Sequence, residues 1–487
     1  MSIDSIQDLE VVNSFAQLPP AFYTRLATTP LRRPRLLHAN ASVAGLLGLS
    51  PRALAGQDFL DVCAGSVPLR GGQTLSAVYS GHQFGVWAGQ LGDGRAHLLG
   101  EVITPQGPME IQLKGSGRTP YSRMGDGRAV VRSSVREYLA SEAMAGLGIP
   151  TTRALAIVVG DDPVYRETEE RAAVVARVSP SFIRFGSFEH WGGSPQNLRI
   201  LLDYVIDRFY PECRVQDNPG ESALRFLRQV VARSARLVAD WQTVGFCHGV
   251  MNTDNMSILG LTMDYGPYGF MDGFQINHVC NHTDAQGRYA WNAQPSVVNW
   301  NLYRLASCLT VLDIEADALR AELQHYEDDF LAAYRGNLVR KFGWLQWREG
   351  DDMLVDDWWR LLHNQQADFT LGFRRLAQAL SDPEPWLDLF SDRAAAQAWL
   401  AAYAQRLTLE NRPDAERIAA MQSANPLYVL RNHLAEQAIQ AAHREDSGEI
   451  ETLLKLLRDP YVEQPGYEDY AQPAPEWACR LEVSCSS

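Results

Sequence analysis

Several features are scarce in this sequence, beginning with cysteine. The 487 residues include seven cysteines, which are scattered, odd in number and never paired as CxxC. This pattern fits a reducing compartment and excludes a disulfide scaffold or a zinc ribbon. The longest purely aliphatic run, residues 154–159, is far too short to span a membrane, and the acidic N-terminus lacks the features of a secretory signal. We therefore expect a cytoplasmic protein without a membrane partner.

Positive charge is also in deficit, since 44 Lys and Arg stand against 58 Asp and Glu and the net charge is −14. A chain this acidic is a poor general binder of nucleic acid, which requires a positive field. Residues 114–136 are the exception, because they carry one Lys and five Arg against the single acid Asp126. A small basic island in an acidic protein favours a compact anion such as a nucleotide polyphosphate.

Lysine is scarce, since only three of the 44 basic residues are lysines: Lys114, Lys341 and Lys455. Arginine is evidently used wherever it suffices. Lys114, inside the basic island, therefore indicates a site that needs a narrow point charge rather than a planar fork. We interpret the presence of Lys341 and Lys455 as sequence drift without a functional role.

The remaining composition, 46% hydrophobic and 21% charged, is that of a folded globular protein. Residues 81–178 alternate Gly-rich turns with short β-like runs around one helix-like segment near residues 130–144. Residues 221–242 and 300–457 have apolar side chains at helical spacing. The acidic residues between Asp351 and Asp357 are interpreted as a solvated helix edge.

These patterns predict an α+β fold built from two main lobes with a ligand cleft between them. The expected parts are an N-terminal extension (1–80), a β-rich lobe (81–178), a larger helical lobe (179–457) and an extended C-terminal tail (458–487).

A Gly-rich turn at residues 89–95 precedes a strand-like run. Its glycines, Gly92 and Gly94 among them, would let backbone N–H groups approach a phosphate closely, although Gly-rich hairpin turns also occur without any ligand. The strand-like residues 111–113 then end at Lys114, which would reach phosphates under the turn. A surface lysine is the alternative interpretation.

An acid on the following helix would hold Lys114 in place, as an ion pair does in protein kinases. Glu137 and Glu142 are both candidates. Helical periodicity puts Glu142 nearer the apolar face but does not choose between them. The alternative for each is an ordinary solvated helix acid.

The strongest local pattern is His-Gly-Val-Met-Asn-Thr-Asp-Asn at residues 248–255, followed by Asp264-Tyr265-Gly266. Protein kinases use H-R-D-x-x-x-x-N and then D-F-G, in which the Asn and the second Asp hold Mg²⁺ on the nucleotide phosphates. Asn255 and Asp264 match these positions, so we predict that they bind Mg²⁺ or Mn²⁺, which prefer hard oxygen ligands.

The position of the kinase base is occupied by Val250, which cannot accept a proton. The only nearby carboxylate is Asp254, beside the predicted metal ligand Asn255. The metal ligands of a kinase site are therefore present, whereas its proton acceptor either lies at another position or is absent. The alternative is that both motifs are simple turns, which such residues make readily.

These motifs, together with residues 111–123, 136–139 and 148–153, resemble the selenoprotein O family over most of the chain. The resemblance implies a protein-kinase-like fold with two lobes. It also implies a pseudokinase that transfers AMP, rather than phosphate, to protein hydroxyls and binds ATP in the reverse orientation to kinases.

The resemblance further implies roles for individual residues. Glu137 would pair with Lys114, Asp254 would accept the proton, and Asn255 and Asp264 would bind the metal. Charge-assisted arginine contacts would stabilise the leaving pyrophosphate. The residues expected to hold ATP are Gly92, Gly94, Arg95, Lys114, Asp126, Gly127, Arg177, Arg184 and Asp264.

We therefore predict an enzyme that uses ATP with Mg²⁺ or Mn²⁺ to put AMP on Ser, Thr or Tyr hydroxyls of proteins, with UMP from UTP as a variant. It would act as a monomer on ATP and protein substrates. One alternative is a phosphotransferase with ordinary ATP orientation. The other is a non-catalytic nucleotide-binding pseudokinase, which the missing acid at Val250 favours.

The family resemblance also bears on two cysteines, Cys280 and Cys485. Several members of the family carry a selenocysteine near the C-terminus, where this chain has Cys485, and Cys280 lies where a kinase activation loop would be. A regulatory disulfide between Cys280 and Cys485 would tether the tail over the active site, and two free thiols are the alternative.

Overall fold

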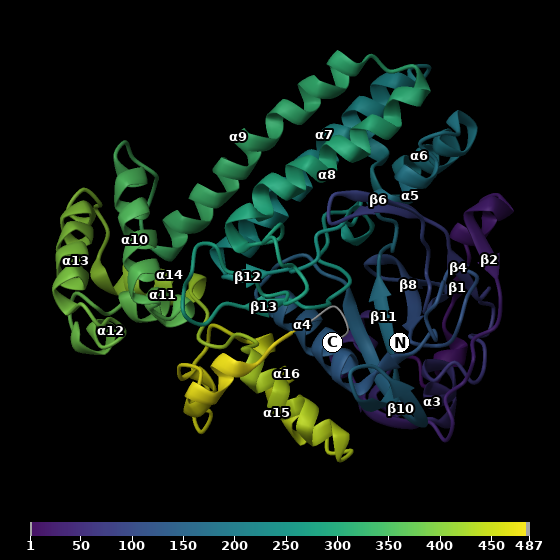
Figure 1. Ribbon diagram of the computed structural model, residues 1–487, viewed down its shortest axis with the longest axis horizontal. Coiled ribbons are helices and arrows are strands. Elements are labelled where there is room, and N and C mark those ends of the chain that lie inside the picture. The colour runs from purple at the N-terminus through teal and green to yellow at the C-terminus, as the bar shows by residue number, and fades with distance from the viewer. Residues whose placement is uncertain (1, 484–487) are drawn as a thin grey trace.

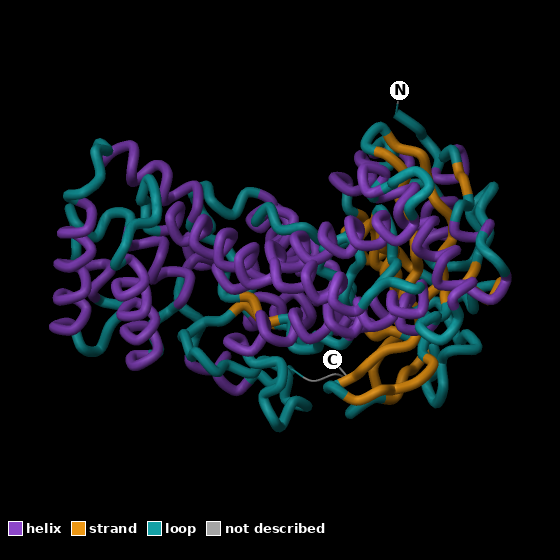
Figure 2. Tube along the Cα trace, turned by 90° about the horizontal axis from the view of Figure 1, so that it is seen from above, coloured by secondary structure: helices purple, strands orange, loops and turns teal. Residues whose placement is uncertain are grey.

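The structure of the protein is a computed structural model that describes residues 2–483. Strands gather at one end of the molecule and helices extend to the other end (Figures 1 and 2). The strands are β1 (Val11–Val12), β2 (Tyr23–Arg25), β3 (Arg35–Ala39), β4 (Leu75–Ala77), β5 (Ser80–Gln83), β6 (Val86–Gln90), β7 (Ala96–Thr104), β8 (Gly107–Lys114), β9 (Ala129–Val130), β10 (Arg153–Tyr165), β11 (Glu169–Ser179), β12 (Phe246–Cys247) and β13 (Gly269–Phe270).

Within residues 2–483, nine of these strands form one antiparallel sheet with the order β2-β4-β7-β8-β11-β10-β3, in which β1 also pairs with β7 and β9 with β11. The first 80 residues contribute β1 to β4 to this sheet. The boundary expected near residue 80 therefore falls inside one hydrogen-bonded sheet. Strands β5 and β6 form a separate hairpin, and β12 and β13 a separate ribbon.

The helices complete a mixed α/β fold. They are α1 (Ala41–Leu46), α2 (Pro51–Leu54), α3 (Gln57–Cys63), α4 (Val131–Gly146), α5 (Phe185–His190), α6 (Pro195–Phe209), α7 (Pro219–Thr243), α8 (Gln294–Leu309), α9 (Ala316–Lys341), α10 (Asp351–Gln365), α11 (Phe369–Leu376), α12 (Glu384–Leu387), α13 (Arg393–Leu407), α14 (Asp414–Ala424), α15 (Asn432–His443) and α16 (Gly448–Arg458). No helix in residues 2–483 is both long and apolar enough to cross a membrane.

The sheet is covered on both faces. Along β10, Leu155 and Val158 pack into the core shared with α1 and α3, whereas Ile157 and Val159 pack into the core shared with α4. This double burial explains why residues 154–159 are apolar without alternation, because each face of the strand meets a hydrophobic layer. Helix α4 is thereby fixed across the sheet.

Helix α4 also contacts α15 and α16, so the last helices of the chain return to the sheet end of the molecule (Figure 1). The contact is close, because a Cβ added at Gly146 would lie 1.8 Å from the carbonyl oxygen of Leu457. A separate aromatic core, which includes Trp358, Trp386 and Trp399, holds α10 to α13 together.

The local predictions from the sequence are confirmed for these elements. The strand-like runs became β7, β8 and β10, and the helix expected near residues 130–144 is α4. Helix α7 begins at Pro219, where the side chain of Asn218 accepts a hydrogen bond from the Glu221 amide at 3.0 Å. The interpretation of Asp351 as part of a solvated helix edge is wrong, because this residue is buried and its carboxylate pairs with Arg406 at 2.5 Å.

Candidate active site

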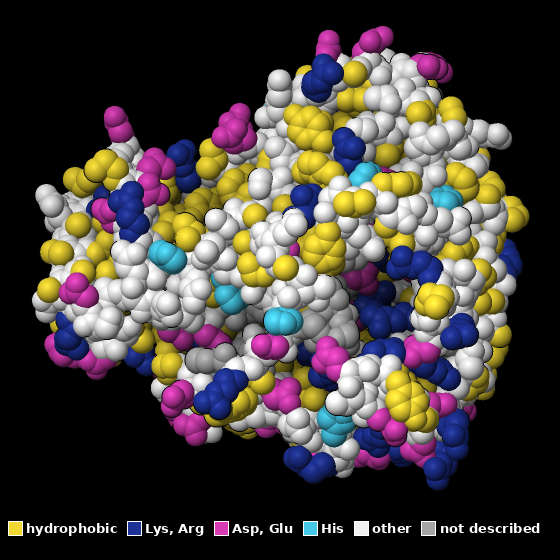
Figure 3. Space-filling view, in the orientation of Figure 1, with side chains coloured by type: hydrophobic (Ala, Val, Ile, Leu, Met, Phe, Trp, Pro, Cys, Tyr) yellow, Lys and Arg dark blue, Asp and Glu magenta, His cyan; other side chains and the backbone are white. Residues whose placement is uncertain are grey.

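A cavity of about 640 Å³ opens between the sheet and the loops that follow α7. Figure 3 shows a hollow with Lys and Arg side chains in it and along its right side, next to acidic side chains. The residues that the sequence proposed for nucleotide, metal and proton transfer all line this one cavity: Gly92, Gly94, Arg95, Lys114, Asp126, Gly127, Glu137, Arg177, Arg184, Asp254, Asn255 and Asp264.

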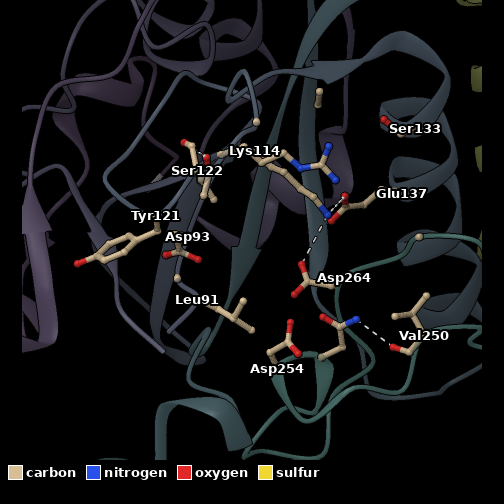
Figure 4. Close-up of a pocket in the computed structure, with 18 of the residues that line it drawn as sticks. Leu91, Asp93, Lys114, Tyr121, Ser122, Ser133, Glu137, Val250, Asp254 and Asp264 are labelled. Atoms are coloured by element: carbon tan, nitrogen blue, oxygen red, sulfur yellow. Dashed lines mark hydrogen bonds and ion pairs between the residues drawn. The ribbon is translucent and has the colours of Figure 1, made fainter. Parts of the chain in front are cut away.

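Lys114 lies at the end of β8 and points toward α4 (Figure 4). Its Nζ lies 2.6 Å from Oε2 of Glu137 and 3.5 Å from Oδ1 of Asp264. Burial lowers the pKa of the Lys114 ammonium, and the charge of Glu137 opposes that shift. The ion pair that the resemblance implied is thus formed.

Glu142, the other candidate partner of Lys114, faces elsewhere. Its carboxylate accepts two hydrogen bonds from Arg153 at 2.7 and 2.8 Å. The side chain of Glu142 is fully buried, so this pair holds the C-terminal half of α4 to the start of β10. Glu142 therefore belongs to the scaffold and Glu137 to the cavity.

Asp264 is the most strongly held carboxylate of the cavity. Its Oδ1 accepts a hydrogen bond from Arg177 at 2.6 Å and its Oδ2 one from Arg184 at 2.5 Å. Burial alone would raise the pKa of Asp264, but the charges of Arg184, Arg177 and Lys114 outweigh it and lower the pKa far below the usual range. Asp264 is therefore ionised at neutral pH.

Arg177 and Arg184 are buried, which the sequence did not indicate. Arg177 also donates to Glu137 at 2.9 Å, and Arg184 donates to the backbone oxygen of Asp254 at 2.7 Å. Both guanidinium groups thus tie strand β11 and the residues after it to the acidic loops of the cavity. Their first role in this structure is to neutralise and orient Asp264.

Asp254 and Asn255 lie in a short 3-10 helix, Thr253–Asn255. The amide nitrogen of Asn255 donates to the backbone oxygen of Val250 at 2.9 Å, which leaves the amide oxygen available to the cavity. The Asp254 side chain is only 7% exposed, and its Oδ1 is buried without a hydrogen-bond partner. Burial raises the pKa of Asp254 to about 6.

The arrangement of acids fits a divalent cation of the Mg²⁺ type. Asn255 and Asp264 both line the cavity and carry hard oxygen atoms. In Asp254, the residue before Asn255, the Oδ1 atom is buried without a hydrogen-bond partner. Within residues 2–483 no cluster of three or more His, Cys, Asp or Glu side chains forms a complete metal cage. Mg²⁺ does not need one, because it is commonly bound by one or two side chains together with water and phosphate oxygens.

Three arginines of the cavity have no carboxylate partner in the described part of the chain: Arg95, Arg123 and Arg128, of which Arg128 donates to the backbone oxygens of residues 29 and 30. Arg95 precedes β7, and Arg123 lies in the loop between β8 and β9. By contrast, Arg166 makes a bidentate pair with Asp126 at 2.7 and 3.0 Å. Arg123 and Arg166 were missed as site residues, although Arg123 lies within a stretch that carried the family resemblance.

The glycines of the turn are required by packing. A Cβ added at Gly92, which has a φ of 145°, would lie 2.4 Å from Cγ of Tyr121. At Gly94 the nearest atom would be the backbone oxygen of Tyr121 at 2.9 Å. The loop that carries Tyr121 therefore crosses directly over the Gly-rich turn, a contact that the sequence did not signal.

Cys280 lies near this site but not in the cavity lining. Its thiol donates to the backbone oxygen of Pro267 at 3.0 Å. Close by, the His282 amide donates to the backbone oxygen of Val483 at 2.9 Å, so the end of the described chain reaches the Cys280 loop. Cys485 itself lies outside the described residues, and the disulfide stays a prediction.

Comparisons with known proteins place the chain in a family. The family model described as "Protein adenylyltransferase SelO" matches residues 5–458. The chain belongs to the SelO family. Among the curated members it resembles, the "Protein nucleotidyltransferase YdiU" of Bordetella parapertussis is 64% identical over 490 residues, which is 99% of each chain. The protein of the same name from Ralstonia nicotianae is 53% identical over 97% of this chain and 95% of its own length. SelO membership therefore extends over nearly the whole molecule.

Proposed function

We propose that this chain transfers AMP from ATP to Ser, Thr or Tyr hydroxyls of proteins and releases pyrophosphate. As a SelO family member it is a protein nucleotidyltransferase of the adenylyltransferase type. One observation carries the proposal for this site: the Lys114–Glu137 pair, Asp254, Asn255 and Asp264 line a single cavity.

The nucleotide would lie between a sheet-bearing lobe and a helical lobe in the manner of a protein kinase. Lys114, oriented by Glu137, would contact phosphate oxygens, and the backbone at Gly92, Gly94 and Gly127 would approach the phosphates closely. Support for this placement of the nucleotide comes from the 2.6 Å ion pair and from the presence of all three glycines in the cavity lining.

The far phosphates would lie against the arginines of the cavity. Arg95 and Arg123 have no carboxylate partner within residues 2–483, so their charges are available to an anion. Arg177 and Arg184 would add positive charge from beneath, while Asp126 would keep Arg166 in place at the rim. Charge that develops on the leaving pyrophosphate would thereby be stabilised.

Asp254 would accept the proton of the attacking hydroxyl. Val250, at the position of the kinase base, has no group that can do so, and Asp254 has a buried oxygen without a hydrogen-bond partner in the same cavity. Gln83 donates to the other carboxylate oxygen at 3.2 Å and would hold the side chain in place.

Asn255 and Asp264 would hold Mg²⁺ or Mn²⁺. When bound, the ion would supply Lewis-acid polarisation of the phosphate that is transferred. Arg177 and Arg184 keep Asp264 ionised and oriented toward the cavity, and Val250 fixes the amide of Asn255.

Three further features belong to the proposal. The enzyme would act as a monomer in the cytoplasm. A disulfide between Cys280 and Cys485 would tether the tail near the cavity under oxidising conditions, since the His282–Val483 hydrogen bond brings the tail to the Cys280 loop. Intact mass with and without reductant tests the disulfide, and an unchanged mass would contradict it.

The central test uses ATP labelled at either the α or the γ phosphate, with a protein acceptor and Mg²⁺ or Mn²⁺. We expect label from the α position in the acceptor and none from the γ position. Label from the γ position alone would instead identify a phosphotransferase with ordinary ATP orientation. The same assay with α-labelled UTP measures whether UMP is also transferred.

A further inference from the structure

The hairpin formed by β5 and β6 projects beside the cavity and ends in an unusual turn. Phe84 and Gly85 connect the two strands with φ angles of 50° and 81°. A two-residue hairpin turn requires such positive angles, but Asn or Gly normally occupies the first position. A bulky aromatic residue in this conformation is a strained outlier, and such outliers gather at functional sites.

Phe84 is held in this conformation by two residues of the segment between α7 and α8. Its amide donates to Oδ1 of Asn252 at 3.1 Å and to the hydroxyl of Tyr289 at 2.9 Å. The Phe84 ring lines the mouth of the cavity and is nevertheless 37% exposed. The strained turn therefore presents an aromatic residue to solvent at the edge of the cavity.

The apolar surface continues outward from Phe84. Val86 is 70% exposed and Trp87 is 50% exposed, both on β6. The ring of His82 joins Trp87 to Trp300 of α8, with centroid distances of 5.1 and 5.3 Å. Hydrophobic side chains lie on the face that Figure 3 shows, beside the hollow and where Figure 1 places β6.

Two arginines border this apolar surface. The guanidinium carbons of Arg288 and Arg304 lie 4.9 and 5.3 Å from the ring centroid of Trp300. Neither guanidinium has a carboxylate partner within residues 2–483, and the Nε atom of each is buried without a hydrogen-bond acceptor. Two acids of the surrounding segments are engaged with other partners: Glu189 with His82 and Thr253, and Asp284 with the backbone amides of residues 288 and 289.

We propose that this surface, made of Phe84, Val86, Trp87, Trp300, Arg288 and Arg304, docks an acidic and apolar segment of the protein substrate. The inference rests on the proposed function and adds to it the chemistry of the partner. Arginines without a carboxylate partner attract carboxylates even on a protein of net charge −14, and exposed aromatic rings beside them bury apolar side chains. The docked segment would lie near the acceptor hydroxyl, because Phe84 belongs to both the surface and the cavity mouth.

The test uses two synthetic peptides that carry the same single Thr acceptor. One has Glu and Leu residues on both sides of the Thr, and the other has Lys in place of each Glu. Binding is measured by fluorescence anisotropy without ATP, and transfer is measured with α-labelled ATP. We expect the acidic peptide to bind and to react at least about fivefold better than the basic peptide.

Two variants locate the effect on the surface. Trp87→Ser should weaken both peptides, and Arg304→Glu should reverse the preference so that the basic peptide binds better. The control variants Met353→Ser and Arg360→Glu replace a large apolar residue and an arginine at exposed positions of α10. Neither should change the binding of the two peptides. Reversal by Arg304→Glu is an effect that misfolding would not produce.

The outcomes separate the two proposals. Equal binding of both peptides, or no binding of either, would overturn the docking surface and leave AMP transfer to other acceptors untouched. Selective peptide binding without any incorporation of α-label would support the docking surface and contradict the proposed function.

Discussion

Glu137 is shared by two cations, since Lys114 and Arg177 each contact one of its oxygens. Glu137→Gln should therefore release Lys114 from its orientation and slow AMP transfer about a hundredfold or more, a magnitude typical of a lost electrostatic contact in an active site. The measurement is kcat for transfer of α-label. An unchanged kcat would show that the pair does not orient the nucleotide.

Glu142→Gln is the matched control on the same helix. It removes the bidentate pair with Arg153 in a fully buried position and leaves Arg153 without its charge partner. We expect a loss of about 3 kcal/mol in the free energy of unfolding, with kcat preserved in the protein that remains folded. A loss of kcat equal to that of Glu137→Gln would mean that both variants act only through stability.

Glu110 makes the stability of the protein depend on pH. Its buried side chain accepts a hydrogen bond from the Phe182 amide at 2.8 Å, and burial raises its pKa to about 8. The charged groups that also influence it are Glu101, Arg208 and Asp93. Between about pH 5 and pH 8 the folded state keeps a proton that the unfolded state has lost, so this group reduces the free energy of unfolding by about 1.4 kcal/mol for each pH unit.

Glu110→Gln should remove that contribution while its amide oxygen still accepts the hydrogen bond from Phe182. The variant is expected to gain stability relative to the wild type as the pH rises from 5 to 8, with little difference at pH 5. Thermal unfolding of both proteins at several pH values measures this. A constant difference in Tm across the range would contradict the raised pKa.

At the scale of elements, α4 depends on its contact with α16. Gly146→Ala would push a methyl group into the backbone of Leu457, which cannot move as a flexible side chain could. We expect a clear loss of Tm and, because α4 carries Glu137, a loss of transfer activity. Gly45→Ala in α1 is the control, since its added Cβ meets nothing within 4 Å and should leave the protein as stable or raise its stability by about 0.5–1 kcal/mol. Equal effects of both changes would refute the α4–α16 contact.

Elements that depend on local pattern were predictable from the sequence. The turn, strand and helix that carry Gly94, Lys114 and Glu137 have their own glycine and periodicity signals, and they lie where those signals indicated. Periodicity could not choose between Glu137 and Glu142, because the partner Arg153 comes from a later strand. The burial of Asp351 was likewise hidden, since Arg406 lies 55 residues away in the sequence.

Pairings between distant segments were missed for the same reason. The first 80 residues have short strands whose partners, β7 and β10, follow much later in the chain. The hairpin surface has no local signal either, because Trp300 and Arg304 reach it from α8. Contacts of this kind are set by packing of the whole fold, which composition and periodicity do not encode.

At the scale of the whole molecule, the cavity joins the sheet to the loops after α7, so its ligand should stabilise the entire fold. A ligand at 100 times its Kd adds about 2.7 kcal/mol to the free energy of unfolding. We therefore expect ATP with Mg²⁺ to raise Tm, and EDTA to remove part of that increase. Asn255→Ala removes one predicted metal ligand but leaves Asp264, Lys114 and the arginines, so ATP should still stabilise this variant and Mg²⁺ should add less to its Tm than to that of the wild type. An Mg²⁺-dependent rise in Tm of the same size in Asn255→Ala and in the wild type would contradict the assignment of Asn255 to the metal.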